Sequence, residues 1–422
     1  MSRAPEAAAP VRAGPRPENY SFSFARLVGG AWFSYTTYGV LIAVLPLAEL
    51  AEGGGPLLAT LIIGAPLLAQ TLASWGWGWL ADRTGTRRGP LVLAVAAQAP
   101  LFLTFPLIDA PELLAVRLIQ SGLFGSIVLA TTQATEDPRA SAAVRLGRLQ
   151  FAQGGGMLSG VALAFPLLIQ SGFHLRSAVG WEFSGLLAGL TAISAAVFWT
   201  ARDLPRASTP GRRTPFGVSS HPGIFRLAVA TAAVSTVRYI PVTAIPVYLS
   251  DRLGAHGFFG LPMNTTAQLA LWLAVSSALN LFASPVSGRL SDSTGSRRRV
   301  LMVFSMAYAV VWAALFLEPD YLVTFAVWVV PVSVFLVVAI VREAAGLSQP
   351  AERGRAVGLV IAAINLGGLL GGAAAGSLLA AGVGFSGVFL VSLVGGVAAA
   401  CLFLPRVVRL PPPTEAVSTT AT

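Results

Sequence analysis

Apolar residues run along the whole chain in long stretches that are separated by short polar segments. An α-helix of about 20 residues crosses the hydrocarbon core of a bilayer, and glycine and proline inside such stretches are common in membrane helices. The pattern predicts an all-α membrane protein with twelve transmembrane helices, six in each half of the chain. Their expected bounds are 25–48, 57–80, 90–108, 113–134, 149–170, 180–200, 225–249, 266–288, 300–317, 321–341, 357–380 and 385–404.

The composition agrees with a chain that lies in a membrane. Of the 422 residues, 55% are hydrophobic and 11% are charged, whereas a soluble domain carries charge on about a quarter of its residues. The single cysteine, Cys401, excludes a disulfide within one chain, and the three histidines lie in loops without a second ligand, so no metal site is expected. No nucleophile, base and orienting acid converge, so neither enzyme activity nor a cofactor is expected.

Arginine is distributed unevenly between the loops, and the chain has no lysine. If the N-terminus is cytoplasmic, 24 of the 28 arginines fall in cytoplasmic segments. The positive-inside rule then predicts an even number of spans with both termini in the cytoplasm. We expect the protein to lie in the plasma membrane of a prokaryote. The net charge of +10 follows from this topology. Because the arginines are scattered over short loops, no nucleic-acid partner is expected.

One charged segment between apolar stretches occurs twice. The sequence GWLADRTGTRRGP at residues 78–90 returns as GRLSDSTGSRRRV at residues 288–300, with an offset of 292 − 82 = 210. A second pair of segments repeats glycines with spacings of 9 and 4, at 147, 156 and 160 and again at 358, 367 and 371. The prolines of spans one and seven align at 246 − 46 = 200, which places Arg238 opposite Tyr38.

These repeats predict a chain built from two similar halves. We expect a disordered cytoplasmic tail over 1–22, a six-helix half over 23–201, a cytoplasmic linker over 202–223, a second six-helix half over 224–405 and a cytoplasmic tail over 406–422. Repeated halves of this kind are typical of secondary transporters, which bind substrate near the bilayer midplane between them.

The repeated charged segment also carries a family resemblance. Residues 78–88 resemble the signature loop between spans two and three of the major facilitator superfamily, and RLIQSG at 117–122 approximates a second motif, with Ser121 in place of a glycine. A third motif, the Gly-Pro dipeptide that is typical of drug antiporters in span five, is missing. The resemblance covers essentially the whole chain. It implies the major facilitator fold and transport of a small solute by alternating access, as in drug and sugar efflux members.

We call the two charged segments the latch. A glycine at position 78 allows helices to approach closely, one at position 85 allows a tight turn, and a helix N-terminus or an arginine could hold the acid at position 82. The family resemblance implies that this loop stabilises the outward-facing state. Alternatively, the arginines only set the topology. The expected latch residues are Gly78, Asp82, Arg83, Gly85, Arg87, Arg88, Gly288, Asp292, Gly295, Arg297 and Arg298.

Two arginines lie inside the apolar stretches. Arg238 is 238 − 226 = 12 residues from Arg226, near the centre of span seven, and Arg117 is 117 − 112 = 5 residues beyond Glu112. A central arginine costs about 2.5–3.5 kcal/mol to insert, so it should face a wet cavity or a partner. The alternative is a structural tie between helices. The expected cavity residues are Arg238, Tyr38, Tyr35, Tyr239, Ser235, Arg117, Gln120, Asn280 and Asn365.

No acidic residue falls at the centre of an expected span. Proton-coupled transporters often use a buried carboxylate, and Glu49 and Glu182, at span ends, are the candidate proton sites. Our first functional hypothesis is a monomeric exporter of a drug-like, sugar-like or metabolite-like solute. A second is uptake or exchange of an organic anion through Arg238. A third, from another class, is a membrane receptor or scaffold that transports nothing.

Overall fold

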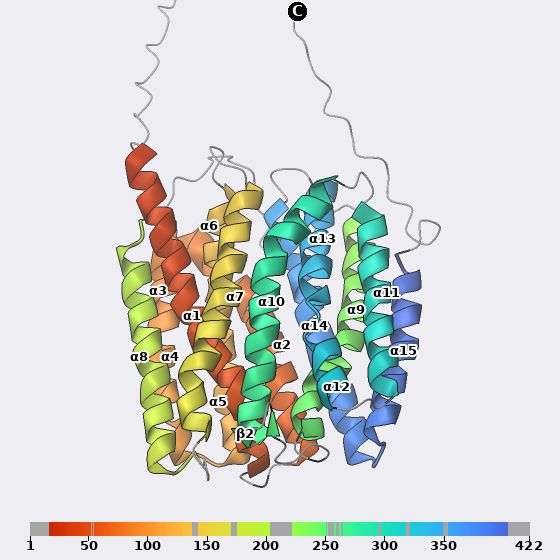
Figure 1. Ribbon diagram of the computed structural model, residues 1–422. Helices are drawn as coiled ribbons and strands as arrows, with labels where there is room; N and C mark the ends of the chain where they lie inside the picture. The colour runs from red at the N-terminus through yellow and green to blue at the C-terminus, as the bar shows by residue number, and fades with distance from the viewer. Residues whose placement is uncertain are drawn as a thin grey trace, which may run out of the picture.

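Long helices packed side by side form the molecule, and their connections gather at two ends (Figure 1). The computed structural model describes residues 17–51, 53, 55–136, 142–169, 175–202, 222–249, 251, 257–258, 261–262, 265–293, 297–317, 321–348 and 353–403. α1 (Pro17–Ala51) and α9 (Pro222–Tyr248) begin, and α8 (Ala178–Thr200) and α15 (Phe385–Cys401) end, at what we call the arginine-rich end. At the opposite end, Arg176 and Asp109 form an exposed ion pair.

In the first half of the chain, two expected spans are interrupted. α2 (Pro56–Thr84) is followed by α3 (Arg88–Ala96), α4 (Gln98–Phe102) and a 3-10 turn η1 (Phe105–Leu107), which together form one span. The next span consists of α5 (Ala110–Phe124), η2 (Gly125–Ile127) and α6 (Val128–Glu136), and α7 (Ala142–Ile169) then precedes α8. The break after α3 has a local cause, because Pro100 has no N–H to donate to the carbonyl of Ala96.

The second half contains α9, α10 (Thr265–Ser293), α11 (Arg297–Phe316), α12 (Tyr321–Trp328), α13 (Val332–Leu347), α14 (Arg353–Ala380) and α15. α12 and α13 form one interrupted span, and Pro331 stands directly before α13. A short antiparallel pair, β1 (Gly257–Phe258) and β2 (Leu261–Pro262), lies between α9 and α10. The sequence patterns did not predict this hairpin, because two-residue strands leave no periodicity to detect.

Most of the expected spans have the length and hydropathy of membrane helices. Ten described segments qualify, and they correspond to every expected span except the fifth and the twelfth. α7 and the 17-residue α15 lie at those two places. The all-α membrane fold is therefore confirmed. The expected count of twelve transmembrane helices is reached only if α7 and α15 also cross the membrane.

The expected domain boundaries differ from the structure at the N-terminus. α1 begins at Pro17, so residues 17–22 are helical although they were expected to belong to a disordered tail. Proline is favourable in the first turn of a helix, where its missing N–H has no intrahelical partner to lose. The rest of that tail, most of the 202–223 linker and the 406–422 tail lie outside the described residues.

The repeat is visible in how helices pack within each half. A Cβ on Gly156 of α7 would overlap the carbonyl oxygen of Trp32 in α1, and a Cβ on Gly367 of α14 would meet that of Ala232 in α9. Trp32 and Ala232 are 232 − 32 = 200 positions apart, which is the offset of the aligned prolines. The repeated glycines therefore serve the same purpose in both halves, because each lets two backbones approach closely.

The two halves meet closely along α2 and α14. A Cβ on Gly64 would lie 2.9 Å from the carbonyl oxygen of Gly368, and Gly372 and Thr60 continue this contact. Gly78 is 78 − 64 = 14 residues further along α2, about four turns, and therefore lies on the same face. A Cβ there would meet no described atom within 4 Å. The contact therefore stops before the arginine-rich end.

Candidate functional site

Arg117 is the centre of a buried polar cluster in the first half. Its side chain is 2% exposed, and its guanidinium donates to the side-chain oxygen of Gln120, one turn along α5. Gln120 Nε2 in turn donates to Oε1 of Gln98 in α4, at 2.6 Å. The Arg117 Cζ lies 5.3 Å from the centre of the Tyr38 ring, which comes from α1. Neutral amide and aromatic groups therefore hold this charge.

Tyr38 belongs to an aromatic group between α1 and α5. Its ring stacks on Phe124, with centres 5.0 Å apart and an interplanar angle of 14°. Tyr35 meets the same phenylalanine edge to face, at 5.4 Å. The two tyrosines are three residues apart, so they share one face of α1, and both are partly exposed. Phe124 thus fixes both rings beside Arg117.

Arg238 is the centre of a second cluster, in the other half. Its Cζ lies 5.0 Å from the ring centre of Tyr239 and 6.0 Å from that of Tyr308. The guanidinium also has a polar interaction with the Tyr308 hydroxyl, which in turn interacts with Ser333. Ser333 Oγ donates to Oδ1 of Asn280 at 3.4 Å. Helices α9, α10, α11 and α13 all contribute to this cluster.

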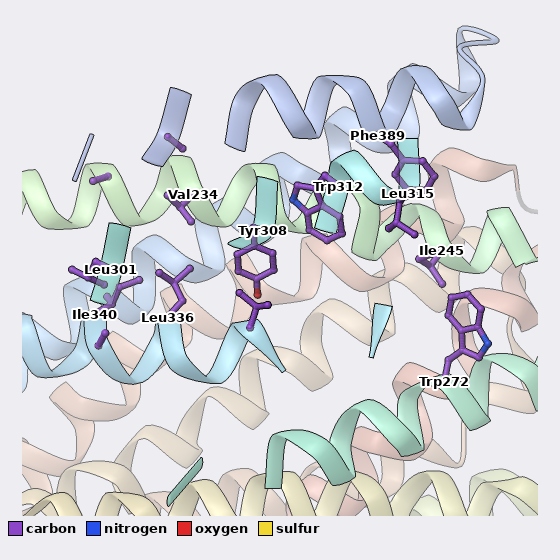
Figure 2. Packing of buried hydrophobic residues seen from close by; sticks show 14 of the residues in the cluster. Val234, Ile245, Trp272, Leu301, Tyr308, Trp312, Leu315, Leu336, Ile340 and Phe389 are labelled. Carbon is purple, nitrogen blue, oxygen red and sulfur yellow. The ribbon is translucent and has the colours of Figure 1, made fainter. Parts of the chain in front are cut away.

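The Tyr308 ring is fixed from the side of the hydrophobic core. It stacks on Trp312, with ring centres 5.5 Å apart and an angle of 21°, and Trp312 is 2% exposed. Figure 2 shows both rings among buried aliphatic side chains, with the Tyr308 oxygen directed away from Trp312. The core therefore sets the position of the ring against which Arg238 lies.

The two clusters approach each other between the halves. Tyr38 of α1 and Tyr239 of α9 are close enough to act on each other electrostatically, so the tyrosines of the two clusters lie near each other between the halves. Among the described residues, the contacts of both arginines are to tyrosine and glutamine side chains, and none is to a carboxylate. A charge removed from water without a counter-charge is costly. The pair therefore provides a positive environment for an anion.

Other expected cavity residues have different neighbours. Ser235 is buried, and its Cβ packs against Gly367 in the contact between α9 and α14. Asn365, on α14, is 9% exposed. Asn280 joins the Arg238 cluster through Ser333. The prediction that Ser235 lies on the cavity side with Arg238 overlooked the close approach of α14.

The two candidate proton sites lie in opposite environments. Glu49, near the end of α1, is fully buried, with 0% exposure. Glu182 lies on the exposed face of α8. A carboxylate on an exposed face does not have the enclosure that a proton-coupling group needs. The structure therefore leaves Glu49 as the candidate of the two.

The first copy of the latch is partly described. Gly85 has a φ of 73°, the left-handed conformation that ends α2 and favours glycine. Arg87 is buried, whereas Arg83 lies over Trp79 and Arg88 over Trp199 of α8. In the second copy, Gly288 and Asp292 lie on α10 and Arg297 and Arg298 begin α11, whereas Gly295 lies outside the described residues. The side chains of Asp82, Asp292, Arg297 and Arg298 also lie outside what the structure describes.

The sequence analysis missed four residues of the two clusters. These are Gln98, Phe124, Tyr308 and Ser333. The repeat could have revealed two of them, because 308 − 98 = 210 is the offset of the latch copies, so Gln98 and Tyr308 occupy equivalent places. Phe124 and Ser333 had no such signal.

Comparison with known sequences decides the family. The sequence model of the Major Facilitator Superfamily matches residues 27–340 and 227–421. The chain belongs to the Major Facilitator Superfamily. Its relatives include an MFS-type transporter of Mycobacterium tuberculosis strain CDC 1551, 27% identical over 282 residues, which are 65% of this chain and 58% of that protein. The counterpart in strain H37Rv is 26% identical over the same length. The match thus spans less than two thirds of either relative.

Solved structures show the same fold at low sequence identity. A bacterial homologue of the human lysosomal transporter Spinster, in an inward-facing and occupied conformation, has a TM-score of 0.69 and 18% identity, covering 92% of this chain and 97% of that one. The human organic anion transporter MFSD10 has a TM-score of 0.70 at 12% identity, and the match covers 92% of this chain and 100% of that one. A D-xylose–proton symporter has a TM-score of 0.68 at 16% identity, and the match covers 94% of this chain and 98% of that one. This multi-pass membrane protein therefore has the major facilitator fold.

Proposed function

We propose that this protein is a secondary transporter that moves a small organic anion across the plasma membrane by alternating access. The observation that carries the proposal is the pair of arginines, one in each half, whose described contacts include no carboxylate. A substrate anion between the halves would supply the missing negative charge. Superfamily members bind small-molecule substrates within the membrane, and the proposed site lies at the level where repeated halves meet.

Arg238 is the group that we assign to the anion. Aromatic rings lie against the guanidinium, and a guanidinium that is stacked in this way still presents its N–H donors in its own plane. A carboxylate or phosphate accepts two of those donors in parallel, which gives both strength and a fixed orientation. Arg238 and Tyr239 are partly exposed, so a solute can reach them.

A different observation supports export of an uncharged drug-like or sugar-like solute. Tyr35 and Tyr38 present partly exposed rings beside Phe124, and flat rings also bind sugars and drugs through stacking. Among proteins with this fold are a nucleoside transporter, a D-xylose–proton symporter and an organic anion transporter. The fold therefore accepts each class of solute, and the arginines favour the anion. Coupling to protons would use Glu49.

The decisive experiment is a ligand screen of the purified full-length protein. A ligand that binds only the folded state raises the melting temperature. We expect mono- and dicarboxylates to raise it, D-xylose, uridine and a cationic dye to leave it unchanged, and proteoliposomes to accumulate the carboxylate that stabilises most. Stabilisation by the sugar, nucleoside or dye alone would overturn the anion assignment, and binding without transport would favour a receptor.

The direction of the chain in the membrane is part of this proposal. We place the arginine-rich end in the cytoplasm, because arginine is retained on that side. In a Cys401→Ser background, cysteines introduced at Ala110 and Gly257 should react with an impermeant thiol reagent on intact cells, and one at Thr209 should not. The reverse pattern would invert the topology.

A further inference from the structure

The two copies of the repeat carry different side chains at equivalent places on α1 and α9. The offset of 200 gives three such pairs, which are Trp32 and Ala232, Tyr35 and Ser235, and Tyr38 and Arg238. The first member of each pair is aromatic, whereas the second is small or charged. The halves therefore share one backbone plan but differ in chemistry along this stretch of helix.

The three aromatic residues follow one another along α1, and we call Trp32, Tyr35 and Tyr38 the aromatic ladder. Each is three residues from the next, so successive rings are about 4.5 Å apart along the helix and differ in direction by about 60°. All three side chains are partly exposed. Because α1 begins at the arginine-rich end, Trp32 lies nearer that end and Tyr38 lies deeper in the bundle.

Neighbouring rings hold the aromatic ladder in place. Phe124 packs against both tyrosines, and the ring centre of Phe151 lies 5.9 Å from that of Trp32, at an angle of 46°. Side chains that are already fixed lose little conformational freedom when a ligand binds. Contacts between aromatic rings also gain free energy beyond the burial of apolar area. The ladder is therefore suited to a flat aromatic group.

The position of Trp32 depends on a glycine in α7. A Cβ on Gly155 would lie 2.3 Å from Cη2 of the indole, so a larger residue would displace the ring. The glycine repeat has an offset of 367 − 156 = 211, which places Leu366 at the position equivalent to Gly155. Glycine thus accompanies tryptophan in the first half, and leucine accompanies Ala232 in the second. The room for the indole is therefore specific to the first half.

The aromatic ladder ends near the accessible charge of the other half. Tyr38 and Tyr239 are close enough to act on each other electrostatically, and Tyr239 lies against Arg238. Arg117 also lies against Tyr38, but it is 2% exposed and donates to Gln120. The partly exposed Arg238 and the rings of the ladder are therefore within reach of a single small molecule.

We propose that the transported anion carries an aromatic ring. Its carboxylate binds Arg238, and its ring stacks on Tyr35 and Trp32. The inference rests on the proposed function and narrows the substrate to an aromatic carboxylate with a short linker between its two groups. A sugar could stack on the ladder but offers no charge to Arg238, and an aliphatic carboxylate would leave the ladder without a stacking partner.

Three ligands of similar size test the proposal by isothermal titration of the purified full-length protein. 3-Phenylpropionate has both groups, 3-cyclohexylpropionate has the charge without the aromatic ring, and 3-phenylpropanamide has the ring without the charge. We expect 3-phenylpropionate to bind about tenfold more tightly than the cyclohexyl acid, because stacking adds to apolar burial. The amide should not bind measurably.

Variants of the ladder locate the ring. Leucine keeps an apolar contact, so Tyr35→Leu and Trp32→Leu should each weaken binding of 3-phenylpropionate about fivefold and leave 3-cyclohexylpropionate unchanged, whereas Tyr35→Phe should retain the affinity. Gly155→Ala displaces the indole and should also weaken binding of 3-phenylpropionate. Gly154→Ala is its matched control, because a Cβ there would lie 3.6 Å from Leu281, an ordinary contact.

The outcomes separate this inference from the proposed function. Equal affinity for the two acids would overturn the inference but leave transport of an anion intact. Unchanged affinity of Tyr35→Leu and Trp32→Leu for 3-phenylpropionate would also overturn it, by removing the ladder from the site. Equal affinity for 3-phenylpropionate and its amide, or binding of neither acid, would contradict the proposed function and this inference with it.

Discussion

Arg117 and Arg238 are both enclosed by the helix bundle, but the protein holds them in different ways. Arg117 is 2% exposed and donates to Gln120, which Gln98 holds in turn. Arg238 is partly exposed, and its described contacts are to tyrosines. The side-chain oxygen of Gln120 and the Tyr38 side chain hold the first charge within the protein, whereas the second retains donors that a solute can reach. We infer that Arg117 stabilises the first half and that Arg238 binds the substrate.

The largest effect should come from removing the accessible charge. Arg238→Gln should weaken carboxylate binding about 100-fold, because a charge-assisted bidentate contact is lost, with little change in melting temperature. Arg226→Gln, on the same helix and exposed, should bind as the wild type does. Isothermal titration and thermal unfolding of the same preparations measure both quantities. Equal affinity in the wild type and Arg238→Gln would remove this residue from the site.

A second test concerns the buried arginine. Gln120→Leu removes the acceptor of Arg117 and the donor to Gln98, so buried polar groups lose their partners. The free energy of unfolding should fall by about 2 kcal/mol, seen as a lower melting temperature. Gln70→Leu, on a partly exposed part of α2, should cause a smaller loss. If Gln120→Leu instead abolished substrate binding at full stability, the two arginines would have the same role.

Charge and geometry at Arg238 can be separated. Arg238→Lys retains the charge but loses the planar fork that binds two oxygens, so carboxylate affinity should fall about tenfold. The carboxylate affinity of this variant should therefore lie between those of the wild type and Arg238→Gln. An affinity equal to that of the wild type would show that only the charge matters, and it would contradict the assignment of a bidentate contact.

The smallest effect is expected from the hydroxyl beside Arg238. Tyr308→Phe keeps the stacking on Trp312 but removes one neutral polar contact, so affinity should fall about three- to fivefold. Tyr321→Phe removes a hydroxyl that accepts from Trp272 Nε1 elsewhere in the same half, and it should leave affinity unchanged. A similar decrease in both variants would indicate a general loss of packing.

The membrane fold was predictable because the bilayer imposes a simple rule. Each span must satisfy its own backbone hydrogen bonds and present apolar side chains for about 20 residues, which leaves a clear pattern. Interruptions such as the one between α3 and α4 were not predicted, because apolar composition continues across them. The glycine repeat predicted equivalent packing in both halves, and Gly156 and Gly367 show it.

Contacts in the candidate site were predictable from the sequence only where both residues lie on the same helix. Arg238 and Tyr239 are adjacent on α9, and their contact follows from local geometry. Gln98 and Gln120 lie on separate helices, so their hydrogen bond depends on how α4 and α5 pack. The spacing of residues along the sequence does not say how far apart two helices lie. The same reason explains why Ser235 was expected beside Arg238, although the approach of α14 assigns it to a helix contact.

The close contact between α2 and α14 is confined to the first half of α2, so the rest of α2 can act as a lever arm. Gly64 lies in the contact, and Gly78 is 14 residues beyond it, which gives an arm of about 21 Å. If α2 tilts by about 10° about Gly64, the far end moves by about 4 Å, and an equal tilt of α14 doubles the change in gap. A rotation that barely disturbs the glycine contact is therefore large enough to admit or exclude a small solute at the other end.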